Sequence, residues 1–141
     1  MSMQIAVEVA PGMADQLTIE QGLQAHDAVA LPPARPEPLW VIARDDAGSV
    51  QGGLRGSTMW GWLYVDQLWV AESARRRGIG GQLLAAAEQT ARERGCVGVH
   101  VHTFTSQAPA FYLKRDYREA GRIADLPAGQ DWIWLEKPLA S

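Results

Sequence analysis

The residues of this chain that are best suited to chemistry lie in the run Arg75-Arg76-Arg77-Gly78-Ile79-Gly80-Gly81, called here the glycine loop. Three guanidinium groups can donate charge-assisted hydrogen bonds to an anion, and glycines let the backbone approach it closely. A strand pattern precedes the loop and an amphipathic helix pattern follows it. Because the first N–H groups of a helix lack intrahelical partners and carry partial positive charge, this arrangement predicts a phosphate-binding site.

Two common nucleotide-binding loops do not fit this run. A P-loop requires Gly-Lys followed by Ser or Thr, whereas this chain has Gly80-Gly81-Gln82. A dinucleotide-binding loop requires a third glycine, where Leu83 stands, and an acidic residue about twenty positions later, where His102 stands. The glycine loop is therefore of another kind.

Two segments together resemble one known family. The string from Arg75 to Gly80 matches the signature R/Q-x-x-G-x-G/A of the GNAT family of N-acetyltransferases. Downstream, residues 108–117 (APAFYLKRDY) resemble the family segment A-x-x-[FL]-Y-x-K-x-G-[FY], with Asp116 in place of its glycine. Thr105 replaces a common asparagine, and the string TFTSQA at 103–108 resembles a sub-branch with T-F-x-x-Q-A.

The resemblance implies an N-acetyltransferase that uses acetyl-CoA as its cosubstrate. It implies that the glycine loop wraps the pyrophosphate, that a backbone N–H near Val70 faces the developing oxyanion, and that the Tyr112 hydroxyl protonates the leaving thiolate. A core aromatic on a short helix is the alternative interpretation of Tyr112. The residues that the resemblance assigns to the cofactor are Leu68, Trp69, Val70, Arg75, Arg76, Arg77, Gly78, Ile79, Gly80, Gly81 and Tyr112.

Amine acetylation also requires a base, because an alkyl amine with a pKa of roughly 10.4 is mostly protonated at neutral pH. Asp66 and Glu72 lie on or just after the apolar run 60–71, and Asp66 is the predicted catalytic residue. A carboxylate in so apolar a run can have a raised pKa. Simple alternation puts Asp66 on one face with Leu68 and Val70, which a bulge would change. The alternative is a carboxylate that accepts hydrogen bonds from neighbouring backbone N–H groups.

Histidine and tryptophan side chains also gather in this half of the chain. His100 and His102 lie on one face of a predicted strand, where they could relay a proton through water or simply pack. Two histidines without a nearby third ligand do not predict a metal site. The tryptophans predict core or interface packing, with an aromatic wall for a cationic substrate as the alternative; they are Trp60, Trp62, Trp69, Trp132 and Trp134.

The elements that must position these residues follow from hydrophobic periodicity and turn residues. Ile79, Leu83, Leu84, Ala87 and Ala91 share one face of a helix that Gly95 caps, with Glu88 and Arg92 as an ion pair on the other face. Other predicted helices cover 13–28 and 108–115, and a proline-rich loop covers 31–38. Strands are predicted at 4–9, 39–44, 50–56, 60–71, 97–102, 118–124 and 132–136.

These elements form one mixed α/β domain over residues 1–141. The resemblance implies a central, mostly antiparallel sheet of six to seven strands flanked by helices, with a splayed strand pair that holds the cofactor. It also implies a homodimer.

Composition narrows the class of protein further. A net charge of −3 and a pI near 5.5 argue against a general nucleic-acid binder. The single cysteine, Cys96, excludes an intramolecular disulfide. The start of the chain lacks the pattern of a signal peptide, and no apolar run reaches the ~18 residues of a membrane helix, so we expect a cytoplasmic protein with no membrane partner.

Three functions are consistent with these patterns. The leading hypothesis is transfer of an acetyl group to an amine of a small molecule or to an exposed amine of a protein. A catalytically silent acyl-CoA sensor would keep the glycine loop but would not need Asp66 or Tyr112. An interaction protein would use its aromatic strands to build a dimer.

Overall fold

A computed structural model describes residues 2–107 and 109–140. The contacts of the chain divide it into two units, residues 1–33 and residues 34–141, and each is described here by itself. A single domain over 1–141 stays a prediction. Ala108, the first residue of the predicted helix 108–115, lies outside the described residues.

The first unit consists of an extended segment and the helix α1 (Met13–Asp27), which begins after Gly12 as predicted. The strand predicted at 4–9 is wrong, because this segment has no regular secondary structure. Its alternating side chains Ile5, Val7 and Val9 are between 96% and 98% exposed. Alternation selects a face for a strand, but a strand also needs a neighbour that satisfies its backbone hydrogen bonds.

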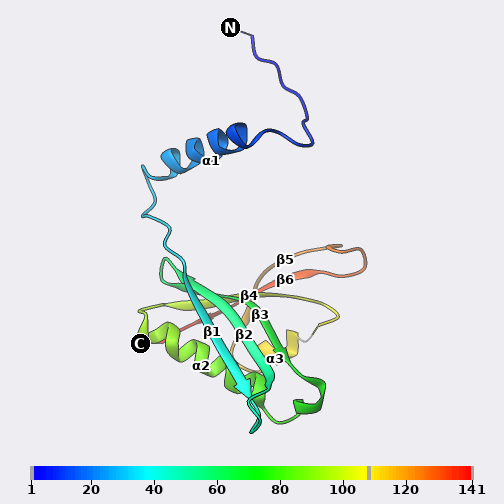
Figure 1. Cartoon of the computed structure of the whole chain (residues 1–141). Helices are drawn as coiled ribbons and strands as arrows, with labels where there is room; N and C mark the ends of the chain where they lie inside the picture. Colours follow the sequence, from blue (N-terminus) through cyan, green and yellow to red (C-terminus); the bar gives the residue numbers. More distant parts are fainter. Residues whose placement is uncertain (1, 108, 141) are drawn as a thin grey trace. The chain divides into compact units, whose positions relative to one another are not determined.

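The second unit is built on a six-stranded sheet in the order β1-β2-β3-β4-β6-β5. All neighbouring strands are antiparallel except β3 and β4, which run parallel (Figure 1). The predicted mixed α/β class and the mostly antiparallel sheet are therefore confirmed. The strands are β1 (Glu37–Arg44), β2 (Val50–Met59), β3 (Trp62–Val70), β4 (Gly98–Phe104), β5 (Arg118–Ile123) and β6 (Trp132–Pro138).

Each predicted strand of this unit differs from the observed one by one to three residues at one end or both, and two of these differences have a local cause. β1 already begins at Glu37, so Pro38 is part of an edge strand, where a missing N–H is tolerated. The long predicted strand 60–71 begins two residues late because Trp60 and Gly61 form the turn between β2 and β3, with φ values of 51° and 79°. Such positive φ values reverse the chain tightly, which the aromatic character of Trp60 did not indicate.

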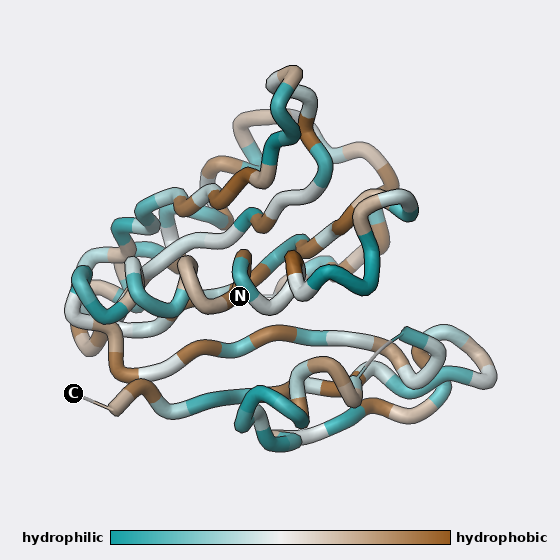
Figure 2. The backbone as a smooth tube through the Cα atoms, turned by 90° about the horizontal axis from the view of Figure 1, so that it is seen from below, coloured by the Kyte–Doolittle hydropathy of each residue, from teal (hydrophilic) through white to brown (hydrophobic). Residues whose placement is uncertain are grey.

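The helix α2 (Ile79–Glu93) covers one face of the sheet and packs against β1, β2 and β3. Hydrophobic and hydrophilic residues alternate along extended segments of the chain (Figure 2). In β4 the buried positions include Val99 and Val101, which enter the core. The predicted pairing of Glu88 with Arg92 is wrong. Glu88 lies on the buried face between Leu84 and Ala91, where it accepts a hydrogen bond of 2.7 Å from Tyr117 Oη.

The parallel pair β3 and β4 separates along its length. Residues Trp62 to Val65 pair with residues Gly98 to Val101, and the pairing ends there although both strands continue. This is the predicted splayed pair. Among the described residues, none of the helices is long and apolar enough to cross a membrane.

Candidate active site

A bulge in β3 determines where the side chains of its second half lie. Gly56 pairs with Val65 and Arg55 pairs with Gln67, so Asp66 is the extra residue between them. Leu68 and Val70 therefore join Val65 on the core side. The prediction that Asp66 shares their face is wrong, because the extra residue shifts the alternation by one position.

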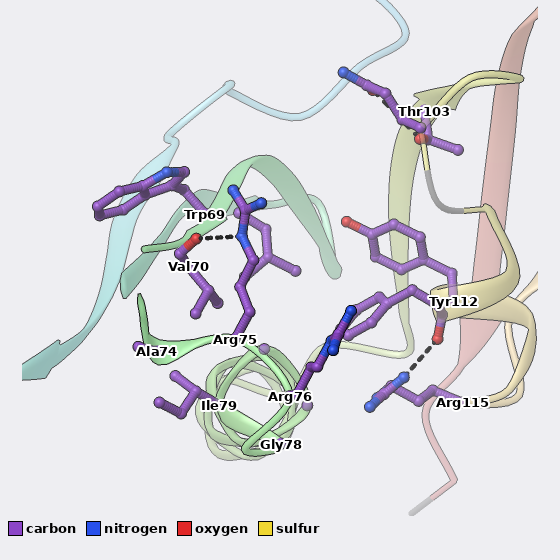
Figure 3. Close-up of a pocket in the computed structure, with 15 residues that line it drawn as sticks. Trp69, Val70, Ala74, Arg75, Arg76, Gly78, Ile79, Thr103, Tyr112 and Arg115 are labelled. Atoms are coloured by element: carbon purple, nitrogen blue, oxygen red, sulfur yellow. Dashed lines mark hydrogen bonds between the residues drawn. The ribbon is translucent and has the colours of Figure 1, made fainter. Parts of the chain in front are cut away.

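The glycine loop follows β3 through a short 3-10 turn, Glu72–Ala74. The chain then passes through two left-handed residues, Arg76 with φ of 65° and Gly78 with φ of 75°, and Gly78 is the N-cap of α2. Arg75 Nε donates a hydrogen bond of 3.1 Å to the Val70 carbonyl oxygen (Figure 3). This bond fastens the loop to the end of β3.

A cavity of about 600 Å³ lies between this loop and the helix α3 (Pro109–Leu113). Every residue that the sequence assigned to the cofactor lines this cavity, except Arg77. Figure 3 shows Arg75 and Arg76 on one side of it and Tyr112 and Arg115 on the other. The lining residues that the sequence did not assign to the cofactor are Ala74, Thr103, Gln107, Phe111 and Arg115.

Gly80 and Gly81 of the loop lie close to α3 and to the residues that follow it. A Cβ atom on Gly80 would lie 3.1 Å from Phe111 Cε1, and a Cβ atom on Gly81 would lie 2.8 Å from Arg115 Nη2. The Arg115 guanidinium stacks on the Phe111 ring at 3.9 Å and donates a hydrogen bond of 2.8 Å to the Phe111 carbonyl oxygen. The first turn of α2 thus has a fixed cation beside it, which suits a phosphate. The sequence signal for this role was the cation pair Lys114-Arg115 directly after α3.

Tyr112 is the buried residue of α3, with its side chain 9% exposed. Its ring packs edge-on against Phe111 and Tyr117, and its hydroxyl points toward the cavity (Figure 3). Burial raises the pKa of Tyr112 to about 12. The hydroxyl therefore stays protonated at neutral pH and can donate a proton.

A second, more polar cavity of about 390 Å³ adjoins the first. Asp66, His102 and Phe104 line it. Five residues line both cavities: Leu68, Trp69, Thr103, Gln107 and Tyr112. The Thr103 hydroxyl donates a hydrogen bond of 3.4 Å to Gln107 Oε1, which links the first and fifth positions of the TFTSQA string at this junction.

The two acidic residues that the sequence singled out have different surroundings. The Asp66 carboxylate forms an ion pair with the guanidinium of Arg55 on β2. Glu72 lies in the 3-10 turn and lines neither cavity.

Aromatic rings cover the face of β3, β4 and β6 that points away from the core. His102 stacks on Trp132 with ring centroids 4.0 Å apart, and His100 stacks on Tyr64 at 5.0 Å. Desolvation lowers the pKa of both imidazoles, so both favour the neutral form. The predicted common face of the two histidines is confirmed.

Known proteins resemble this chain in both sequence and fold. A model of the acetyltransferase (GNAT) family matches residues 13–117. An acetyltransferase of Agrobacterium fabrum is 39% identical over 119 residues, which cover 84% of this chain and 87% of that protein. A blasticidin-S acetyltransferase of Streptomyces morookaense is 46% identical over 98 residues, which cover 68% of this chain and 72% of that protein.

A solved structure extends this similarity to the fold. The crystal structure of an acetyltransferase from Bacillus cereus superposes with a TM-score of 0.86 at 31% identity. The superposition covers 96% of this chain and 98% of that one.

Proposed function

Because the chain belongs to the acetyltransferase (GNAT) family, we propose that it acetylates a primary amine of a small molecule by direct attack within a ternary complex. The enzyme class, an N-acetyltransferase with acetyl-CoA as cosubstrate, is the one predicted from the sequence. The observation that carries the proposal is the junction of the two cavities, where Tyr112 and Thr103 line both. A donor in one cavity and an acceptor in the other would meet there.

The residues of the first cavity fit the cosubstrate. The glycine loop presents the N-terminus of α2, and Arg76 and Arg115 supply positive charge for a pyrophosphate. When bound, acetyl-CoA supplies an acetyl thioester. The separated end of β3 leaves its backbone open toward β4, so the Val70 N–H is our proposed donor to the oxyanion.

Tyr112 is our proposed general acid. Its hydroxyl lies at the junction and is protonated because burial raises its pKa to about 12. A thiolate that leaves during the reaction can take this proton, which prevents the reverse attack on the new amide.

The second cavity supports an amine as the acceptor. The Asp66 carboxylate and the ring of Phe104 both line it, and both attract a cationic ammonium. The 46% identity to a blasticidin-S acetyltransferase supports a small molecule over a protein amine. The role of Asp66 as the base stays a prediction.

Incubation with acetyl-CoA and an amine panel tests this function. The panel contains blasticidin S, spermidine and a lysine peptide, and thiol release is followed beside the melting temperature. We expect acetyl-CoA to raise the melting temperature and a small amine to give thiol release. A shift in melting temperature without release from any amine would favour the silent sensor, and release from the peptide alone would contradict a small-molecule acceptor.

Gly80→Glu tests the placement of the cosubstrate. A side chain at Gly80 must enter the space beside Phe111, and a carboxylate there repels phosphate. We expect this variant to lose both the thermal shift and the thiol release. The matched control is Gly22→Glu in α1, where an added Cβ meets nothing within 4 Å. Retention of the acetyl-CoA shift in Gly80→Glu would contradict the proposed site.

A further inference from the structure

We propose that His102 takes the proton from the acceptor amine and that Tyr64 positions its ring. This inference rests on the function proposed above. For His102 the sequence alone left two interpretations open, a proton relay through water or simple packing.

His102 lies where an acceptor amine would be. It projects from β4 on the face away from the core and lines the second cavity together with Asp66 and Tyr112. His100, two residues earlier on the same face, lies instead beside Trp60, Trp62 and Trp134 in a separate apolar cavity. The two histidines thus share a strand and a face, but only His102 lines the cavity proposed for the acceptor amine.

Neighbouring rings fix the plane of the His102 imidazole. Trp132 stacks on it with an interplanar angle of 11°, and Phe104 meets it edge-on at 87°. Trp134 forms a T-shaped pair with it, with ring centroids 5.3 Å apart. An imidazole held on three sides has few rotamers, so the direction of its ring nitrogens is set before an amine arrives.

Tyr64 engages one of the two ring nitrogens. Its Oη lies 3.1 Å from His102 Nδ1, whereas Nε2 has no hydrogen-bond partner among the described residues. When Nδ1–H donates to the phenolic oxygen, Nε2 carries the lone pair that accepts a proton. The same hydrogen bond remains satisfied after protonation, because both nitrogens of an imidazolium are donors.

The charges around His102 suit a base that must be neutral before the reaction and cationic during it. Burial lowers its pKa, and the nearby Asp66 carboxylate acts in the opposite direction. Burial and Asp66 both raise the pKa of Tyr64, so the phenol facing Nδ1 stays neutral. From α3 the protonated Tyr112 lines the same cavity, and β6 faces His102 with Trp132 and Trp134, which carry no charge.

His102 fits the task better than Asp66. The Asp66 carboxylate is already paired with Arg55, so a proton on it would break an ion pair. Asp66 then serves to attract the ammonium and to stabilise the imidazolium that forms. This division of roles gives the two residues different pH signatures.

The protons balance as follows. His102 Nε2 accepts one proton from the ammonium, and the freed amine lone pair forms a C–N bond with the thioester carbonyl carbon. As the tetrahedral adduct collapses, the C–S bond breaks and Tyr112 donates its proton to the sulfur. The nitrogen of the adduct gives up a second proton, which restores Tyr112 directly or through water. His102 releases the first proton to solvent, so each turnover yields one amide, one thiol and one proton.

The kinetic test compares His102→Gln with His100→Gln, using blasticidin S as the acceptor. We expect His102→Gln to lower kcat by about 100-fold or more, with the acetyl-CoA Kd unchanged. Between pH 7 and 9 the wild type should be nearly flat in kcat/KM, because neutral His102 is already available. The variant should rise steadily over that range, since it depends on the small fraction of free amine. His100→Gln should keep the wild-type profile.

Two further variants separate the roles. Tyr64→Phe should lower kcat less than His102→Gln and leave KM for the amine nearly unchanged. Asp66→Asn should raise KM mainly and keep the flat profile. If Asp66→Asn converts the flat profile into a rising one while His102→Gln keeps it, the base is Asp66 and our inference is wrong.

A measurement that needs no turnover covers the case in which blasticidin S is not a substrate. Nitrogen-15 NMR of the imidazoles, assigned with His102→Gln and His100→Gln, reports the tautomer of His102 in the full chain. We expect the Nδ1–H form at pH 7.5, with Nε2 unprotonated. The Nε2–H form would overturn the inference even if the wild type acetylates amines. Absence of turnover with any amine, by contrast, would count against the proposed function.

Discussion

Tyr112 belongs to the core and also lines both cavities. Its ring packs between Phe111 and Tyr117, while its hydroxyl lies where both cavities meet. The same burial that secures the ring raises the pKa of the phenol to about 12. The packing of the core therefore keeps on Tyr112 the proton that our proposed mechanism gives to the leaving thiolate.

Tyr112→Phe should lower kcat by about 100-fold while the acetyl-CoA Kd changes little, because the ring is kept and the proton is lost. Single-turnover thiol release and calorimetric titration measure the two quantities. Tyr117→Phe is the matched control, since its hydroxyl bonds Glu88 rather than facing a cavity. Equal turnover in Tyr112→Phe and the wild type would remove this hydroxyl from the mechanism.

At the scale of elements, a buried polar cluster joins α2 to the C-terminal half of the sheet. Glu88 on α2 accepts hydrogen bonds from Tyr117 Oη at 2.7 Å and from Lys137 Nζ at 3.0 Å. The Glu88 side chain is 7% exposed. Removal of the carboxylate would leave the buried Tyr117 hydroxyl and the partly buried Lys137 ammonium without this acceptor, which is more costly than the bond itself is worth.

Glu88→Ala should therefore lower the free energy of unfolding by about 3 kcal/mol or more. Chemical denaturation measures this change. Glu93→Ala, at an exposed position of the same helix, should stay within about 0.5 kcal/mol of the wild type. The triple variant Glu88→Leu, Tyr117→Phe, Lys137→Met removes all three polar groups and should be more stable than Glu88→Ala. Equal stability of Glu88→Ala and Glu93→Ala would show that the cluster contributes nothing.

The sequence predicts elements well where the pattern depends on local geometry. The helix α2 and the glycine loop before it depend on residues that are close in sequence, and the sequence predicted both at their observed positions. The bulge at Asp66 depends on how β2 pairs with β3, and the burial of Glu88 depends on Tyr117 and Lys137, which lie far along the chain. Such partners are not visible in local periodicity.

The candidate site divides in the same way. The motifs predicted most of the residues that line the first cavity, because these residues lie in short consecutive segments of the chain. The place of Arg115 beside Gly81 and the pairing of His102 with Tyr64 were missed, because packing between elements creates them.

For the whole molecule, stability should fall as the solution becomes acidic. Burial lowers the pKa of His100 and His102, so the unfolded chain binds more protons than the folded one once the pH falls below about 6.5. This part of the stability is fully present above that pH and is lost as the pH falls toward the folded-state pKa values. Denaturation at pH 7.5 and 5.5 measures the loss, and the double variant His100→Gln, His102→Gln should show a smaller one. An equal loss in the variant would assign the effect to other groups.

The separation of β3 from β4 also affects how rigid the second unit can be. Four paired positions join the strands β1, β2 and β3 to the strands β4, β6 and β5 across this seam. A seam of this length is mechanically compliant, because the two groups of strands can flex about it while few hydrogen bonds are disturbed. A molecule that lies between the unpaired parts of β3 and β4 and contacts both strands would restrict this motion. The candidate active site should therefore be more rigid when acetyl-CoA is bound than when it is absent.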